Sequence, residues 1–325
     1  MRAFAAIAIS TVLAGHAAAA EPLSADGALA ERAGALALDD RCAVLTPEQR
    51  AALRSGIALA RNSLLRGGWG ELNVANMRFA AEAQAAALPC EAEDAAEIFA
   101  GVTSGFEGWS RLPAMVYPGD HRSWSARRPT VDRGWSLIQD ISRRDDERAW
   151  FGLAVGPDGV GRPALALAGD ARAGVVRLRM RDFTLSETMI DPEIRRFAAG
   201  ASDLHPLAAA AAPEVYTRVV WAYQRNQYPR DDWYADGFGG EVEVFWFSED
   251  LIGEIARLDP REALRIEVQY GPRSAEPGPV DYFVEIGDFT PAYFFLSAKS
   301  PAFPPLEPPE PPREVVASDA LPTLR

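Results

Sequence analysis

The spacing of apolar residues changes near Tyr117-Pro118-Gly119, and this change constrains the fold more than any other feature of the chain. Before this point apolar residues recur every three or four positions, which is typical of helices with one buried face. After it they alternate with polar residues, which is typical of half-buried strands. Glycine, proline and aspartate separate the alternating runs at hairpin-like intervals, which favours antiparallel pairing. We therefore predict an α+β protein, in which a helical subdomain at 41–112 precedes an antiparallel β-sandwich or barrel.

Helices are expected at three places in the first part of the chain. The first begins at Thr46-Pro47-Glu48-Gln49, where the threonine can cap and the glutamine can reach back to it, and ends at Gly67-Gly68. The second is expected at Glu71–Leu88. The third follows Ala95–Trp109, where two glycines weaken the helical propensity. Together these helices define the predicted helical subdomain.

The first twenty residues have the pattern of a secretory signal peptide. Arg2 provides a basic start, a short apolar run follows, and small residues end at Ala20, where cleavage is expected. No later apolar run is long enough for a membrane helix. We therefore expect an exported protein, periplasmic or extracellular, with a mobile lead-in at 21–40. A proline-rich tail is expected at 301–325.

Cys42 and Cys90 are the two cysteines of the chain. Both lie in the part expected to be exported, where disulfides persist, so we predict that they are bonded to each other. A bridge over this span would stabilise the folded state by about 4 kcal/mol on the chain-entropy model. No Cys-x-x-Cys motif or nearby histidine accompanies them, so neither a redox site nor a zinc site is predicted.

The alternating runs divide into two β units. The first, at 113–190, is expected to hold strands at 134–140, 149–155, 164–168 and 175–181. A connector is expected at 191–213. The second unit, at 214–300, is expected to hold strands at 217–225, 241–247, 263–270, 280–286 and 292–298, with a helix at 249–258.

Sequence matches indicate that the two β units are related. Trp135 is followed nine residues later by Arg144-Asp145-Asp146, and Trp221 is followed nine residues later by Arg230-Asp231-Asp232. Each unit later reaches Asp-Phe-Thr, at 182–184 and 288–290. We interpret these matches as a duplicated β unit whose matched tryptophans belong to the core. Only the second unit has the insertions at 232–240 and 249–258, where new function would be expected.

The charge of the chain limits its partners. The formal net charge is −13, and removal of the leader with Arg2 leaves 32 basic residues against 46 acidic ones, a net charge of −14. Nucleic acid and anionic membrane surfaces are therefore not expected partners. An envelope protein or a glycan is the expected partner instead.

Residues suited to acid–base catalysis are few. His121 lies in the loop Asp120-His121-Arg122, and Asp231 belongs to one of the paired carboxylates, so these two are the catalytic candidates. No Gly-x-Ser-x-Gly elbow, His-Glu-x-x-His motif or phosphate-binding glycine loop accompanies them. The recurrence of adjacent aspartates fits turn chemistry better than a catalytic pair.

The segment from Asp232 to Glu243 resembles an EF-hand calcium loop. Asp232, Asp236, Gly237 and Glu243 fall at positions one, five, six and twelve of such a loop. Position three is Tyr234, where a carboxylate or amide is expected. The residues after the loop, Val242 to Phe247, have the pattern of a strand, whereas a helix follows an EF-hand loop. Calcium is accordingly the one cofactor that the sequence suggests.

Aromatic side chains in polar loops suggest a binding surface. Trp124, Trp233 and Tyr234 lie among arginines and aspartates and could form a shelf for a sugar or peptide. The residues 245–247, 251–252 and 264–266 resemble periplasmic β-sandwich proteins of the invasion-associated locus B type, over too short a stretch to assign a family. We predict a non-catalytic envelope or extracellular module that binds a protein or glycan. The alternatives are an envelope-polymer hydrolase, with or without the assistance of a metal, and a calcium-stabilised structural module.

Overall fold

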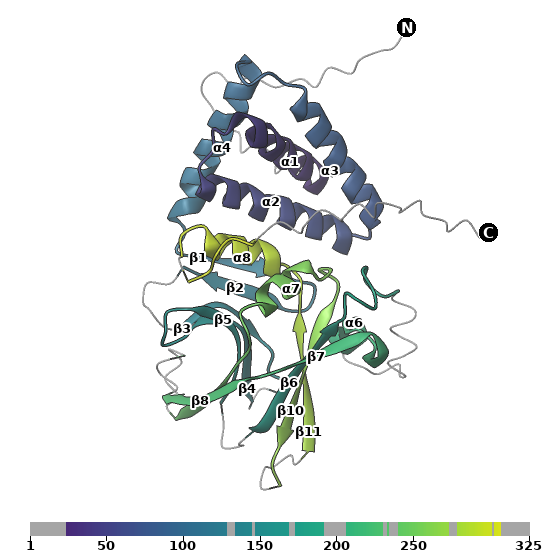
Figure 1. The fold of residues 1–325 in the computed structure, drawn as a ribbon, viewed down its shortest axis with the longest axis vertical. Coiled ribbons are helices and arrows are strands. Elements are labelled where there is room, and N and C mark those ends of the chain that lie inside the picture. The colour runs from purple at the N-terminus through teal and green to yellow at the C-terminus, as the bar shows by residue number, and fades with distance from the viewer. Residues whose placement is uncertain are drawn as a thin grey trace, which may run out of the picture.

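The computed structural model describes residues 24–128, 134–144, 147–168, 173–191, 206–229, 233, 240–272, 278–300 and 302–306. The long helices within residues 25–111 gather at one end of the molecule, and the two β-sheets lie at the other end with the shorter helices beside them (Figure 1). The expected signal peptide and the part of the proline-rich tail after Leu306 lie outside the described residues. None of the described helices is long and apolar enough to cross a membrane.

The helical part begins earlier than the sequence predicts. Helix α1 (Ala25–Cys42) occupies most of the stretch expected to be a mobile lead-in, and Leu29 and Leu38 are fully buried within it. Much of its buried face consists of alanine and of Gly34, where an added Cβ would lie 3.5 Å from that of Ala85 in α3. Small residues allow close helix packing but give a weak periodic signal, so the sequence does not predict this long helix.

The other three long helices agree with the prediction. They are α2 (Pro47–Arg66), α3 (Glu71–Ala86) and α4 (Glu93–Arg111), the last of which continues through its two interior glycines. The predicted capping box is present, because Gln49 donates its backbone N–H to Thr46 Oγ1 at 3.3 Å and Thr46 donates its own to Gln49 Oε1 at 2.8 Å. The predicted disulfide joins Cys42, at the end of α1, to Cys90 beyond α3.

The strands form two antiparallel sheets, so the α+β class is confirmed and the β part is a sandwich, not a closed barrel. The seven-stranded sheet has the order β1-β2-β3-β4-β5-β9-β8, and the four-stranded sheet has the order β11-β10-β6-β7. The strands are β1 (Ala114–Pro118), β2 (Ser123–Arg127), β3 (Gly134–Asp140), β4 (Arg148–Val155), β5 (Gly161–Ala168), β6 (Ala173–Arg181), β7 (Thr217–Trp221), β8 (Gln224–Pro229), β9 (Glu241–Trp246), β10 (Ala263–Tyr270) and β11 (Gly278–Glu285). Shorter helices are α6 (Pro206–Ala210), a 3-10 turn at Glu214–Tyr216, α7 (Leu251–Arg257) and α8 (Phe289–Ser297).

The main core lies between the two sheets. Phe151 of the seven-stranded sheet meets Phe247 edge to face, with ring centroids 6.3 Å apart, and Leu178 and Ile266 of the other sheet are fully buried. A smaller apolar cluster that includes Trp150 covers the other face of the seven-stranded sheet. Packing on both faces of the seven-stranded sheet therefore holds its edge strands and turns in place.

The last expected strand, at 292–298, is instead part of helix α8. Its buried residues include Phe289, Tyr293 and Phe295, and the helix is enclosed between α2 and the seven-stranded sheet (Figure 1). A segment that is apolar on all sides shows neither a helical nor a strand period, so the sequence alone could not decide between them. The start of the expected tail also packs, since Phe303 is fully buried against Tyr293, with ring centroids 6.2 Å apart.

One predicted strand, at 217–225, is two strands in different sheets. The backbone N–H of Ala222 donates to Val176 in the four-stranded sheet, and that of Tyr223 donates to Trp246 in the seven-stranded sheet. The chain therefore passes from one sheet to the other at these two residues, so that β7 and β8 are the edge strands of different sheets.

The described strands do not show the duplication that the sequence suggests. Trp135 lies in β3 of the seven-stranded sheet, whereas Trp221 ends β7 at the edge of the other sheet and is 54% exposed. Asp182 begins a turn after β6, whereas Asp288 precedes helix α8. The matched residues thus occupy different structural positions, and the expectation that Trp221 is a core residue is wrong.

Candidate functional site

A polar turn joins β1 to β2 beside the contact between the helical part and the sandwich. Its backbone is held by Glu285, a buried residue at the end of β11, whose Oε1 accepts the N–H of Asp120 at 2.6 Å. Its Oε2 accepts the N–H groups of His121 at 3.0 Å and of Arg122 at 2.6 Å. At Gly119 an added Cβ would lie 2.6 Å from the Glu285 side chain, so the close approach requires glycine. The Glu285 carboxylate is thus fully used in fixing this turn.

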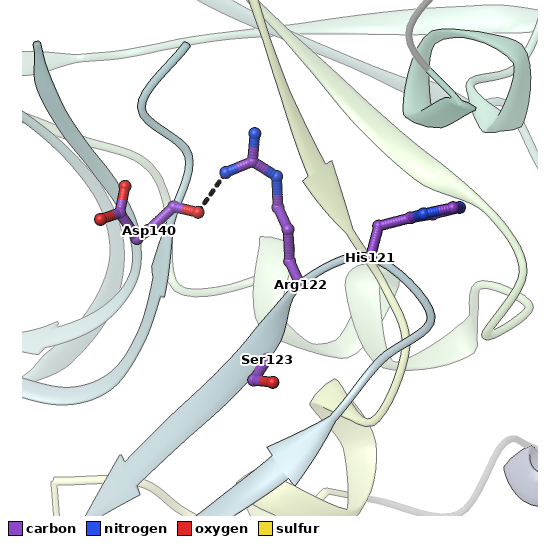
Figure 2. A pocket seen from close by; sticks show the side chains of 4 residues that line it. All are labelled: His121, Arg122, Ser123 and Asp140. Atoms are coloured by element: carbon purple, nitrogen blue, oxygen red, sulfur yellow. Dashed lines mark hydrogen bonds between the residues drawn. The ribbon is translucent and has the colours of Figure 1, made fainter. Parts of the chain in front are cut away.

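An open depression with a volume of about 420 Å³ lies at this turn and is lined by His121, Arg122, Ser123 and Asp140 (Figure 2). Arg122 donates a side-chain hydrogen bond to the backbone carbonyl of Asp140 in β3. Burial lowers the pKa of the Arg122 guanidinium, and the charges of Asp140 and Glu285 oppose that effect only in part. The depression therefore contains a half-buried cation.

His121, a predicted catalytic candidate, lies at this depression but points away from the Arg122 and Asp140 side chains (Figure 2). Its side chain is exposed, and its backbone N–H donates to Glu285. General acid–base catalysis requires a second group placed within hydrogen-bonding reach of the reacting atoms. The described geometry around His121 supplies a polar lining and no such pair.

The other catalytic candidate and most of the predicted calcium loop lie outside the described residues. These are Asp231, Asp232, Tyr234 and Asp236. Glu243, the remaining calcium candidate, is buried on β9, forms an ion pair with Arg225 and accepts the backbone N–H of Ala173 at 3.1 Å. Its carboxylate is therefore already engaged within the protein.

The tryptophans predicted to form a binding shelf do not lie together on the surface. Trp124 is fully buried, and its Nε1–H donates to the carbonyls of Glu285 and Ile286, each at 3.0 Å. Trp233 packs against other aromatic rings, with centroids 5.3 Å from Trp135 and 5.8 Å from Trp246. Trp124 is thus a core residue, and Trp233 contributes to the apolar cover of the seven-stranded sheet.

Strand β7 forms a second candidate site, which is not predicted from the sequence. Backbone hydrogen bonds lie at both ends of its pairing with β6. The N–H of Asp182 donates to the carbonyl of Tyr216 at 2.8 Å, and the N–H of Ala222 donates to the carbonyl of Val176 at 3.2 Å. Because pairing residues alternate in an antiparallel ladder, the even-numbered residues of β7 bond to β6. The backbone groups of the odd-numbered residues, Val219 and Trp221, point away from the sheet.

The same outward residues carry exposed apolar side chains. Val219 is 36% exposed and Trp221 54% exposed, and Val215 and Tyr223 on either side are also exposed. Arg177 of β6 lies over the Trp221 ring, 5.6 Å from its centroid. Alternating apolar residues were visible in the sequence, but the pattern could not show that this face is turned to solvent.

Comparisons with protein-family models, with curated proteins and with solved structures return no match to this chain. Its function must therefore be inferred from the chemistry of its own surface.

Proposed function

We propose that this protein is an exported, non-catalytic module that binds another protein by strand addition along β7. The observation that carries the proposal is the outer edge of β7, where the backbone groups of Val219 and Trp221 point away from β6 and their side chains are exposed. In strand addition, an extended segment of the partner bonds to such an edge through its main chain, and alternate side chains supply specificity. The outward valine and tryptophan suit an apolar partner strand.

The other sheet edges are less suited to strand addition. Natural sheets block their edges with proline and charged residues. Strand β1 follows Pro113 and ends at Pro118, and β8 is polar and ends at Pro229. Strand β11 carries Pro279 and Asp281. Strand β7 contains no proline, and its one charged residue, Arg218, is paired with Glu254, which supports it as the binding edge.

A non-catalytic role is supported by the use of the buried carboxylates in structural contacts. Glu285 holds the β1–β2 turn, and Asp288 binds Arg66 through both oxygens. Glu262 forms a buried ion pair with Arg181, at 2.8 Å. Carboxylates that are saturated in this way are not available as acids or bases. The Cys42–Cys90 disulfide supports export, because such bonds persist in oxidising compartments.

Photo-crosslinking on the native cell envelope tests this proposal. A benzoylphenylalanine placed at Tyr223, beside the edge, should form an adduct with one partner protein. Val219→Pro removes an outward N–H without breaking the β6–β7 ladder, so the variant should fold normally and lose the adduct.

Val116→Pro is the matched control. Val116 is an exposed valine of edge strand β1, and its N–H also points outward. The backbone N–H of Gly119 donates to Arg122 and that of Arg128 donates to Pro113, so the odd-numbered residues of β1 bond to β2 and the even-numbered ones face away. The control should retain the adduct at Tyr223. An adduct that persists in Val219→Pro, or the absence of any adduct in the parent protein, would exclude β7 as the binding edge.

A further inference from the structure

We propose that the depression beside the β1–β2 turn binds the carboxylate group of a small ligand, with Arg122 as its anchor. This site is separate from the β7 edge, and it does not depend on strand addition. Three observations support the inference: the depression itself, the single side-chain hydrogen bond of Arg122 to the Asp140 carbonyl, and the hydrogen bonds by which Glu285 holds the turn.

Arg122 is a partly buried arginine whose guanidinium has no ionic partner among the described residues. Its guanidinium donates to one backbone carbonyl, that of Asp140, and among the described residues no carboxylate forms an ion pair with it. Arg128 also lacks a carboxylate, but it donates to several carbonyls and lies 3.9 Å from the centroid of the Phe295 ring. Several other buried or partly buried arginines have carboxylate partners, as in the pairs Arg66–Asp288, Arg179–Glu267, Arg181–Glu262 and Arg261–Asp259. Arg32 donates to the backbone carbonyl of Gly56 at 3.1 Å.

An unpaired cation in this position is costly, and a ligand anion would offset the cost. Burial disfavours the charged form of Arg122, and the protein compensates only partly through more distant carboxylates. A guanidinium has five N–H donors in a planar fork that matches the two oxygens of a carboxylate. Since one side-chain hydrogen bond goes to Asp140, donors remain for a ligand.

The site is held in place before any ligand arrives. Glu285 accepts the backbone N–H groups of Asp120, His121 and Arg122, and the closure of the turn requires Gly119. Asp140 anchors the guanidinium from the neighbouring strand. Binding to such a fixed site requires little ordering of the protein, which favours affinity.

The surrounding charges favour a carboxylate over a phosphate. The carboxylates of Asp140 and Glu285 act on Arg122, and Asp120 lies on the same turn, so a dianion would meet more repulsion than a monoanion. Ser123 also lines the depression. The volume of about 420 Å³ admits a small organic acid or the terminal residue of a peptide.

Acetate is the first probe, and inorganic phosphate and methylammonium are comparators. The side-chain Nε–H signal of Arg122 is followed by NMR in arginine-labelled protein at constant ionic strength. Acetate should shift this signal and saturate, phosphate should bind more weakly, and methylammonium should have no effect. Phosphate binding as tight as acetate binding would contradict the assignment to a carboxylate.

Variants locate the site, with acetate binding measured through the backbone signal of Ser123. Arg122→Gln should weaken binding about tenfold or more, because a hydrogen-bonded charge pair is lost. Arg127→Gln changes an exposed arginine at the far end of β2 and should leave binding unchanged. Equal affinity in Arg122→Gln and the parent would overturn the proposal. If Arg122→Gln does not fold, Arg122→Lys replaces it, since loss of the planar fork should still weaken acetate binding and unchanged binding would again refute the assignment.

Discussion

Replacing Asp288 by asparagine should loosen the contact between the helical part and the sandwich. The Asp288 side chain is fully buried, and its oxygens accept from Arg66 Nη1 at 2.8 Å, from Arg66 Nη2 at 3.1 Å and from Asn62 Nδ2 at 3.1 Å. Loss of one member of a buried ion pair costs about 3–5 kcal/mol, because the other charge is left uncompensated. Arg66 retains Asp120 at 3.5 Å, so we expect a loss near the lower limit, about 3 kcal/mol.

Equilibrium unfolding in urea, followed by tryptophan fluorescence, measures this loss. Asp158→Asn is the matched control, because Asp158 also pairs with an arginine, Arg162 at 2.6 Å, but on an exposed turn. Surface pairs contribute about 0–1 kcal/mol, so the control should change the free energy of unfolding by no more than that. Equal losses in the two variants would refute the idea that the Arg66–Asp288 pair holds the two parts together.

Three further predictions concern stability. Replacing Cys42 and Cys90 together by serine should reduce the free energy of unfolding by up to about 4 kcal/mol, measured in urea, and an unchanged midpoint would count against the disulfide as a stabilising link. Gly152→Ala should cost about 1–3 kcal/mol or more, seen as a lower melting temperature, because the added Cβ would overlap the backbone of β3; a normal melting temperature would contradict this packing. Burial raises the pKa of Asp259, but the side-chain and backbone N–H groups of Arg261 lower it more, so the folded-state pKa lies below its usual value. This group therefore stabilises the fold above about pH 4, and the contribution is lost as the pH falls through the folded-state pKa, so Asp259→Asn should flatten the acid limb of the melting temperature against pH. Parallel acid limbs in the variant and the parent would exclude that contribution.

The elements with strong local signals were predictable from the sequence. The capping box at Thr46 defines the start of α2, and alternating apolar residues define β10 at Ala263–Tyr270 with the expected bounds. The cysteine pairing followed from the small number of cysteines and the expected export. Elements without a clear period were missed, because the buried face of α1 is built from small residues and α8 is apolar on all sides.

The candidate sites were less predictable, because they depend on long-range contacts. His121 was singled out, but the role of Arg122 depends on Glu285 and Asp140, which are distant in sequence and approach only in the folded sheet. The exposure of Trp221 depends on the passage of the chain between sheets after β7. A strand pattern predicts alternation, but it does not say which face the fold covers.

Hydrogen exchange at β7 tests the central claim most directly. In the free protein, the amides of Val219 and Trp221 should exchange rapidly, because they point outward, and the amide of Val220 should exchange slowly, because it bonds to β6. Addition of the partner identified through the Tyr223 crosslink should slow exchange at Val219 and Trp221. Outward amides that are already protected in the free protein, or that stay unprotected in the complex, would contradict strand addition at β7.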